Sequence, residues 1–301
     1  MQKKKLLKKI ASYGVEKLFL LSACVAVLAL LVIGVYILVS GLPGMFKIGV
    51  GQFLFGEKWS PSEGYYGILT MIIASLAATI GAAVIGVGIG VPTAVFLADI
   101  APKWAVRILR PAVELLAGIP SVVYGYFGLV VLVPFISNTF GGAGNSLLAI
   151  IIILGIMILP TIINLSELAI RAVPRSFVEG SLGLGASRMQ TFLRVSLPSA
   201  KSGITASIIL GVGRAIGETM AVILVAGNTP QIPGSILDSV RTLTINIAFE
   251  MSYASGIHRE ALFATGVVLF AIIMILNFTL QAVLNRKAGT RKRRRAGVKP
   301  R

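Results

Sequence analysis

Residues 115–166 form a run of 52 residues that contains no charged side chain. A helix that crosses a lipid bilayer needs about 20 mostly apolar residues, and a charge near its centre is costly. The polar, glycine-rich segment 137–146 divides the run into two apolar halves, which predicts two spans joined by a short turn. The whole chain is 56% hydrophobic and 13% charged, so its composition excludes a soluble globular protein.

Four further apolar segments bring the predicted number of spans to six. They cover residues 18–40, a helix that begins near residue 67, residues 203–227 and residues 261–284. The first is expected to end at Gly41, Pro43 and Gly44, which are residues typical of turns. The predicted fold class is therefore an all-α, multi-pass membrane protein. Six spans place both termini on the same side of the membrane.

The basic residues predict the orientation of these spans. Of 28 Lys and Arg residues, six lie in 1–17, three in 98–111, five in 167–202 and nine in 285–301, while four lie in the opposite loops. Cytoplasmic loops carry the excess of Lys and Arg, so we expect both termini in the cytoplasm and the chain in the plasma or inner membrane. The expected division is a basic N-terminus 1–17, a first span 18–40, an extracytoplasmic loop 41–66, a five-span core 67–284 with the cytoplasmic loop 167–202, and a basic tail 285–301.

Composition also limits the chemistry of the chain. A single cysteine and a single histidine exclude a disulfide framework and a Cys/His metal cluster, and no cofactor is expected. The sequence contains no Gly-Lys pair and hence no P-loop, so any ATP that drives this protein binds to another chain. The basic run 291–295 is interpreted as a topology anchor that attracts anionic membrane lipid, and not as a nucleic-acid site.

The loop 167–202 is expected to form a rigid elbow of two short helices. Ser176 with Glu179, and Ser187 with Gln190, each fit a capping box, in which the two side chains satisfy free backbone N–H groups at a helix start. Gly185, between them, suits the left-handed conformation that ends a helix. An ordered connection of this length, projecting from a helical bundle, is typical of a docking element.

This elbow resembles the signature of the membrane subunits of binding-protein-dependent ABC importers, which reads Glu-Ala-Ala, three residues, Gly, nine residues, Ile-x-Leu-Pro. Glu179, Gly185, Leu197 and Pro198 stand at the matching positions, while Gly180, Ser181 and Val195 replace the two alanines and the isoleucine. The resemblance implies a type I importer fold of the MetI-like kind. It also implies that the segment, including Ser176, couples the chain to a cytoplasmic ATPase. Alternatively, Glu179 only caps its own helix.

Two charges fall inside the fifth predicted span. Arg214 and Glu218 are four residues apart and are expected to share a helical stripe with Ser207 and Gly211. Charges in a membrane are expensive, so this stripe is predicted to line a substrate path, and an ion pair that only locks helices together is the alternative. The planar guanidinium suits a tetrahedral oxyanion because it can bind two oxygens at once. Gly213 and Gly217 form a Gly-x-x-x-Gly ridge suited to a closely packed neighbouring helix.

The segments 214–222, 117–129 and 261–270 resemble the C-type permease subunits of high-affinity phosphate (Pst) importers. This resemblance covers about residues 65–280 and implies a role in phosphate passage for Arg214 and Glu218. The partners it implies are a homologous A-type permease subunit, a cytoplasmic ATPase dimer and an extracytoplasmic phosphate-binding protein. The residues leave open whether a second copy of this chain replaces the A-type subunit.

Gly118, Pro120 and Ser121 lie in the third predicted span and are interpreted as a hinge or subunit contact, with a simple packing kink as the alternative. Arg110 is expected to pair with Glu114, and His258 to lie in a loop.

Three other functions compete with a phosphate permease that is not itself an enzyme. A permease for molybdate or sulfate would carry a similar elbow, and a passive anion channel would conduct without ATP. A membrane enzyme that uses Glu218 as a general base is disfavoured because no span contains a histidine and the one cysteine lies early in the first span.

Overall fold

The computed structural model describes the backbone of residues 2–296 and the side chains of residues 15–282, so the ends of the predicted basic segments 1–17 and 285–301 lie outside the described residues. Apart from a hairpin of two short strands, the named secondary-structure elements of the described chain are helices, which confirms the predicted all-α class in all but this detail. The elements are α1 (Gln2–Ile48), α2 (Val50–Phe55), β1 (Trp59–Ser60), η1 (Pro61–Glu63), β2 (Tyr65–Tyr66), α3 (Leu69–Val95), η2 (Phe96–Ile100), α4 (Lys103–Gly118), α5 (Ser121–Phe127), η3 (Gly128–Leu132), α6 (Val133–Phe140), α7 (Leu147–Arg171), α8 (Arg175–Gly183), α9 (Arg188–Thr191), η4 (Phe192–Ser196), α10 (Leu197–Ser199), α11 (Lys201–Gly217), α12 (Met220–Val225), α13 (Leu243–Glu250) and α14 (Gly256–Ala296).

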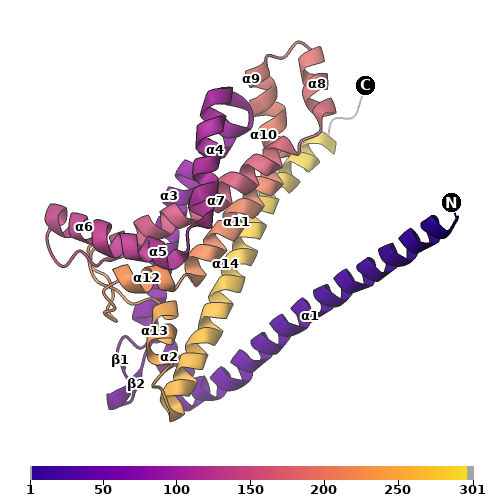
Figure 1. Cartoon of the computed structure of the whole chain (residues 1–301). Helices are drawn as coiled ribbons and strands as arrows, with labels where there is room; N and C mark the ends of the chain where they lie inside the picture. The colour runs from indigo at the N-terminus through magenta and orange to yellow at the C-terminus, as the bar shows by residue number, and fades with distance from the viewer. Residues whose placement is uncertain (1, 297–301) are drawn as a thin grey trace.

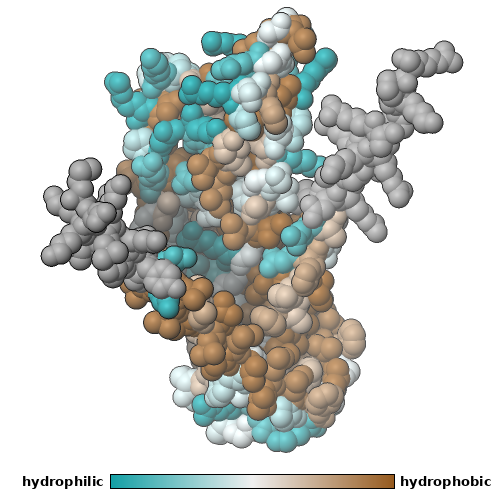
Figure 2. Space-filling view, turned by 90° about the vertical axis from the view of Figure 1, so that its right-hand side faces the viewer, coloured by the Kyte–Doolittle hydropathy of each residue, from teal (hydrophilic) through white to brown (hydrophobic). Residues whose placement is uncertain are grey.

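The molecule is elongated, and its two ends differ. Helices α8 and α9 form one end, here called the elbow end, while the hairpin, α2 and α13 gather at the other, here called the hairpin end (Figure 1). Helix α14 runs between the two ends, and α1 diverges from it toward its own N-terminus. A broad hydrophobic band covers the lower half of the molecule in Figure 2, with hydrophilic residues at the bottom tip and toward the top. This distribution is typical of a protein that crosses a membrane.

Within the described part of the chain, five helical segments are long and apolar enough to cross a membrane, and a bent pair can supply a sixth span. The five cover Val15–Ile48, Leu69–Ile100, Ser121–Phe140, Leu147–Arg171 and Gly256–Ala282, and the bent pair is Arg188–Ser199 with Lys201–Gly217, at 60°. Four of these segments agree with the predicted positions. The first and fifth predicted spans differ from the structure.

The first span does not end at the predicted cluster of turn residues, because α1 continues through Gly41, Pro43 and Gly44 to Ile48. The two glycines serve close packing instead. A Cβ atom at position 41 would lie 2.7 Å from the backbone carbonyl carbon of Phe263, and one at position 44 would lie 2.6 Å from the Cβ of Glu260. Helix α1 therefore uses these glycines to approach α14, as small residues do between membrane helices.

We expect Gly41→Val to destabilise the packing of α1 on α14 by about 1–3 kcal/mol, because the added side chain must displace backbone atoms. Gly34→Val is the matched control, since it adds the same side chain to the same helix where no atom lies within 4 Å of a new Cβ. The measurement is the unfolding midpoint in detergent micelles. Equal midpoints for the two variants would contradict this account of the glycines.

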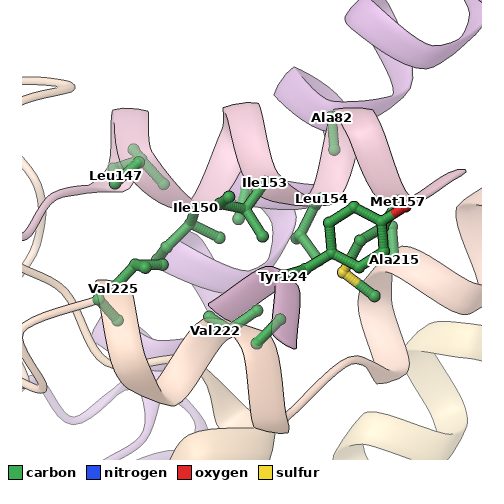
Figure 3. Close-up of a cluster of buried hydrophobic side chains, with 14 of the residues drawn as sticks. Ala82, Tyr124, Leu147, Ile150, Ile153, Leu154, Met157, Ala215, Val222 and Val225 are labelled. Carbon is green, nitrogen blue, oxygen red and sulfur yellow. The ribbon is translucent and has the colours of Figure 1, made fainter. Parts of the chain in front are cut away.

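The core is built around α7, which packs against both α3 and α11, and these two helices also contact each other. Figure 3 shows Leu147, Ile150 and Ile153 of α7 with Val222 and Val225 of α12 in one buried cluster. Helix α3 receives the isoleucine side chains of α7 at its glycines, since a Cβ at Gly86 would lie 2.4 Å from Ile158. Shape matching of this kind holds helices together in lipid, where burial of apolar surface contributes little.

The predicted kink at 118–121 is a complete break between two helices. Helix α4 ends at Gly118, Ile119 and Pro120 are extended, and α5 begins at Ser121. Proline suits this position because it disfavours helical conformation in the residue before it and lacks the N–H group that a helix start leaves free. Pro120 thus precedes the third span and does not lie within it, which corrects the prediction.

A buried carboxylate joins three elements near the elbow end. Glu167 of α7 accepts hydrogen bonds from Arg110 of α4 and from Arg171, at 2.8 Å for the latter. Arg171 also donates to the backbone carbonyl of Leu97 in η2 at 2.7 Å. The predicted pair between Arg110 and Glu114 is therefore wrong, because Glu167 lies closer to the guanidinium across the helix interface.

Candidate functional site

The fifth predicted span is broken at the position of its charges. Helix α11 ends at Gly217, Glu218 is extended with φ −71° and ψ 131°, and α12 begins at Met220. The Glu218 carboxylate accepts a hydrogen bond of 3.3 Å from the Ala221 N–H group, which lies in the first turn of α12. A carboxylate is favoured at a helix start, since it satisfies a free N–H group there. The prediction that Arg214 and Glu218 share one helical stripe is therefore wrong, because Glu218 lies beyond the end of α11.

Helix α12 is held in place by its neighbours on both sides. Its Ala221 lies against Gly125 of α5, where an added Cβ would be 2.7 Å from the Ala221 Cα. Val222 and Val225 of α12 are buried in the core cluster (Figure 3). The break between α11 and α12 is consequently a defined turn of the backbone at the depth of the apolar core.

Arg214, in the last turn of α11, is exposed. Its guanidinium donates a long hydrogen bond of 3.5 Å to the hydroxyl of Thr161 in α7. Among the described residues, no carboxylate lies within 4.0 Å of this guanidinium, and this includes the carboxylate of Glu218. Most of the five N–H donors of the side chain thus have no protein acceptor in the described part of the chain.

The other two residues of the predicted stripe face a different neighbour. The Ser207 hydroxyl is buried 2.6 Å from that of Ser166 in α7. A Cβ at Gly211 would lie 2.9 Å from Ile162, also in α7. Ser207 and Gly211 therefore pack α11 against α7 and do not line the surface on which Arg214 is exposed. The predicted stripe of four residues is therefore wrong, while a part of Ser207 and Gly211 in a substrate path stays a prediction.

The predicted glycine ridge beside Arg214 is uncovered. A Cβ atom added at Gly213 or at Gly217 would meet no atom of the described residues within 4 Å. The ridge is thus available to another helix, and its role as a contact to a second permease subunit stays a prediction.

The elbow forms as predicted at its second helix and differently at its first. At α9, the Ser187 hydroxyl accepts from the Gln190 N–H at 3.2 Å and the Gln190 side chain accepts from the Ser187 N–H at 3.0 Å, which is a complete capping box. Helix α8 instead begins at Arg175 after Pro174, so Ser176 and Glu179 lie inside the helix and form no capping box. Proline suits this start because its ring disfavours helical conformation in the residue before it.

The turn between the two elbow helices presents a large apolar side chain. Gly185 has φ +84°, as its predicted left-handed conformation requires. Directly before it, Leu184 is 90% exposed. Leu197 and Pro198 belong to the short helix α10, which continues into the bent start of α11.

A pocket of about 700 Å³ lies between the elbow and η2, with Asp99, Glu179 and Arg188 among its lining residues. The elbow thus combines a charged recess with a projecting leucine.

Sequence reasoning missed both Thr161 and Leu184. Thr161 follows Pro160 in an apolar span, and a hydroxyl beside a proline in such a span is a signal that could have marked it. Leu184 stands inside the elbow signature at a position where the signature specifies no residue type, so only its exposure in the folded chain identifies it.

Comparison with known proteins places this architecture in a family. Residues 90–290 match the family described as binding-protein-dependent transport system inner membrane component. The chain belongs to this family. The permease is 39% identical over 272 residues to the probable ABC transporter permease protein YqgH of Bacillus subtilis, with 88% of each chain covered. It is 34% identical over 245 residues to the phosphate transport system permease protein PstC of Pasteurella multocida, covering 75% of this chain and 77% of that one.

A solved structure of the same kind supports the fold. The permease superposes on a chain of the inward-facing MetNI methionine ABC transporter with a TM-score of 0.57 and 21% identity, covering 72% of this chain and 94% of that chain. This likeness confirms the predicted type I importer fold. The permease is a multi-pass membrane subunit whose relatives are transport proteins.

Proposed function

We propose that this chain is the permease subunit of an ATP-driven phosphate importer and forms half of the path that phosphate takes through the membrane. The observation that carries the proposal is Arg214, whose exposed guanidinium stands at the break between α11 and α12 with one hydroxyl as its hydrogen-bond partner among the described residues. Relatives from several bacteria, at 33% and 34% identity among others, are phosphate transport system permease proteins named PstC. Molybdate, sulfate and passive conduction are the alternatives that the test below addresses.

Phosphate would meet Arg214 as a transient site. The planar fork of the guanidinium binds two oxygens of a tetrahedral anion, and the nearby Thr161 hydroxyl offers one further donor. Glu218 contributes chiefly by shaping the break, because its carboxylate is engaged with the start of α12. A conducting path needs binding that is strong enough to admit the ion and weak enough to release it. A partly exposed site with one cation satisfies both needs.

The second half of the path would come from a homologous A-type subunit that covers Gly213 and Gly217. These glycines lie beside Arg214 on a face that the described chain leaves open. Small residues allow the backbones of two membrane helices to approach closely. The second subunit would therefore enclose the guanidinium in a path between the two chains.

The elbow would dock on a cytoplasmic ATPase dimer. Its exposed apolar side chains are Phe177, Leu182, Leu184, Met189 and Leu193. Phe177, Leu182 and Leu184 lie outside every candidate span, so lipid does not cover them and a protein partner would bury them, whereas Met189 and Leu193 belong to the bent pair that can supply a sixth span. With both termini in the cytoplasm, as the basic residues predict, the elbow end faces the ATPase and the hairpin end faces an extracytoplasmic phosphate-binding protein.

Uptake of labelled phosphate into proteoliposomes tests this function. The vesicles contain this chain with its candidate A-type partner and ATPase, with binding protein outside and ATP inside. We expect uptake that requires ATP and that excess unlabelled phosphate, but not sulfate or molybdate, reduces. Uptake without ATP would show a channel, and competition by sulfate or molybdate would show a permease for another oxyanion.

A further inference from the structure

Helix α13 extends from the hairpin toward the break beside Arg214. It lies between α12 and the hairpin region (Figure 1). Its eight residues span about 12 Å. One end contacts the backbone of Glu218 and the other carries Glu250, which is buried among residues from three other segments. Neither contact was expected from the sequence.

The inner end of α13 holds the break through a chain of two hydroxyls. The Thr244 hydroxyl donates to the Glu218 backbone carbonyl at 3.1 Å, and it lies 3.0 Å from the Thr242 hydroxyl. Because Thr244 has only one hydrogen to donate, Thr242 must donate to Thr244, while Thr242 itself accepts from the Ile245 N–H group. The three hydrogen bonds therefore run in one direction, from the Ile245 N–H group through the two hydroxyls to the Glu218 carbonyl. Hydrogen bonds in such a series strengthen one another.

This contact replaces a bond that the broken helix has lost. The carbonyl of Glu218 follows the end of α11, where backbone acceptors have no partner within the helix. At this depth an acceptor without a partner is costly, so Thr244 stabilises the break in its observed position. The N–H group of Leu243 is bound in turn by the Ser75 hydroxyl of α3 at 2.9 Å, which ties the same end of α13 to the core.

The outer end of α13 is clamped at two positions one helical turn apart. Arg241 donates to the Asn246 side chain at 3.1 Å and to Glu250 at 2.6 Å. Glu250 also accepts from the indole of Trp59 at 2.9 Å and lies 2.8 Å from the Nε2 atom of His258. His258 stands in the first turn of α14, so its predicted place in a loop is wrong.

Glu250 therefore connects the hairpin, the segment before α13 and the start of α14. The hairpin and the start of α14 lie at the end of the molecule that, in the proposed function, faces the binding protein. Their movement would be passed to α13, because the clamp leaves little freedom between Arg241 and the helix.

From these contacts we infer that α13 is a mechanical link that passes binding-protein engagement at the hairpin end to the Arg214 break, and that Thr244 is the positioning residue at its inner end. The inference rests on the proposed function for the identity of the partner. The contacts themselves predict a coupling within the chain that can be measured without transport.

The test compares Thr244→Val with Thr244→Ser in the assembled complex. Valine keeps the shape and removes the hydroxyl, whereas serine keeps the hydroxyl. Thr265→Val is the matched control, since Thr265 is also buried and its hydroxyl donates to the Ala261 carbonyl of its own helix. We expect Thr244→Val alone to speed amide hydrogen exchange at residues 218–223 by about twofold to tenfold, which is the effect of one hydrogen bond. The same variant should lower binding-protein-stimulated ATPase activity by a similar factor and leave basal activity unchanged.

A second pair of variants tests transmission along α13. Glu250→Gln weakens the clamp to Arg241, and we expect it to speed exchange at residues 218–223 as well. Glu63→Gln weakens the Lys58–Glu63 pair on the hairpin surface, whose hydrogen bond lowers the pKa of the Glu63 carboxyl, and should leave that exchange unchanged. Exchange confined to residues near position 250, or unchanged in Thr244→Val, would overturn the link. If the exchange results hold while the wild-type complex takes up no phosphate, the link stands and the proposed function fails.

Discussion

Replacing Arg214 with glutamine should lower ATP-driven phosphate uptake by about tenfold to hundredfold, since a hydrogen bond to a charged group contributes about 1.5–3 kcal/mol. Glutamine keeps much of the side-chain length and removes the charge and the fork of donors. The structure gives a reason to expect normal assembly, because the guanidinium is exposed and its only contact within hydrogen-bonding range among the described residues is the Thr161 hydroxyl at 3.5 Å. The measurement is the initial uptake rate in proteoliposomes, with copurification of the partner subunits as the check on assembly.

Arg214→Lys is the graded companion to this variant. Lysine keeps the charge and loses the planar fork, so it should transport at a rate between those of the wild type and the glutamine variant. An assembled glutamine variant that transports at the wild-type rate would show that Arg214 is not a phosphate contact. Wild-type transport by the lysine variant would show that charge matters and the fork does not.

Leu184→Asp should weaken binding of the ATPase by about tenfold to hundredfold, because burial of a leucine side chain is worth about 1.5–3 kcal/mol and aspartate adds the cost of a buried charge. The elbow itself should fold normally. Its turn depends on Gly185 and on the bond from the Gly185 N–H group to the Leu182 carbonyl at 2.9 Å, and neither involves the Leu184 side chain. The measurement is the amount of ATPase that copurifies, followed by the ATPase activity of the complex.

Leu184→Met is the matched control for this variant, since methionine keeps the apolar bulk and should bind the ATPase normally. If aspartate at position 184 leaves copurification and activity unchanged, the exposed leucine is not the anchor of the elbow. Docking would then rest on the other exposed side chains of α8 and α9.

The segments most accurately predicted were those that lipid itself specifies. The charge-free runs predicted the second, third, fourth and sixth spans because a bilayer excludes charge over a fixed length of helix. The capping box at Ser187 and the left-handed Gly185 were also predicted correctly, since both depend on neighbouring residues alone. The same kind of local pattern gave a wrong helix start at Ser176, because α8 begins at Arg175, directly after Pro174.

The errors share a physical cause, which is packing between segments far apart in the chain. Gly41 and Gly44 have the same local conformational preference as glycines in turns. Only the packing of α14 against them shows that they allow close contact between two helices. Arg110 pairs with Glu167 and not with Glu114, because the packing of α4 against α7 brings the Glu167 carboxylate nearer to the guanidinium. Ser207, Gly211 and Arg214 were expected on one stripe from helical spacing, but α7 covers Ser207 and Gly211 and leaves Arg214 exposed.

The sequence alone determined that the chain is a membrane protein, where four of its spans lie, which segment forms the elbow and which charges lie in the apolar region. Those properties follow from the cost of charge in lipid and from contacts over a few residues. Only the tertiary structure decided that the fifth span breaks at Glu218, that Arg214 stands apart from it, and that Thr244 and Glu250 hold the two ends of α13. A broken helix persists only where distant residues satisfy its free backbone groups, and sequence spacing does not specify which distant residues those are.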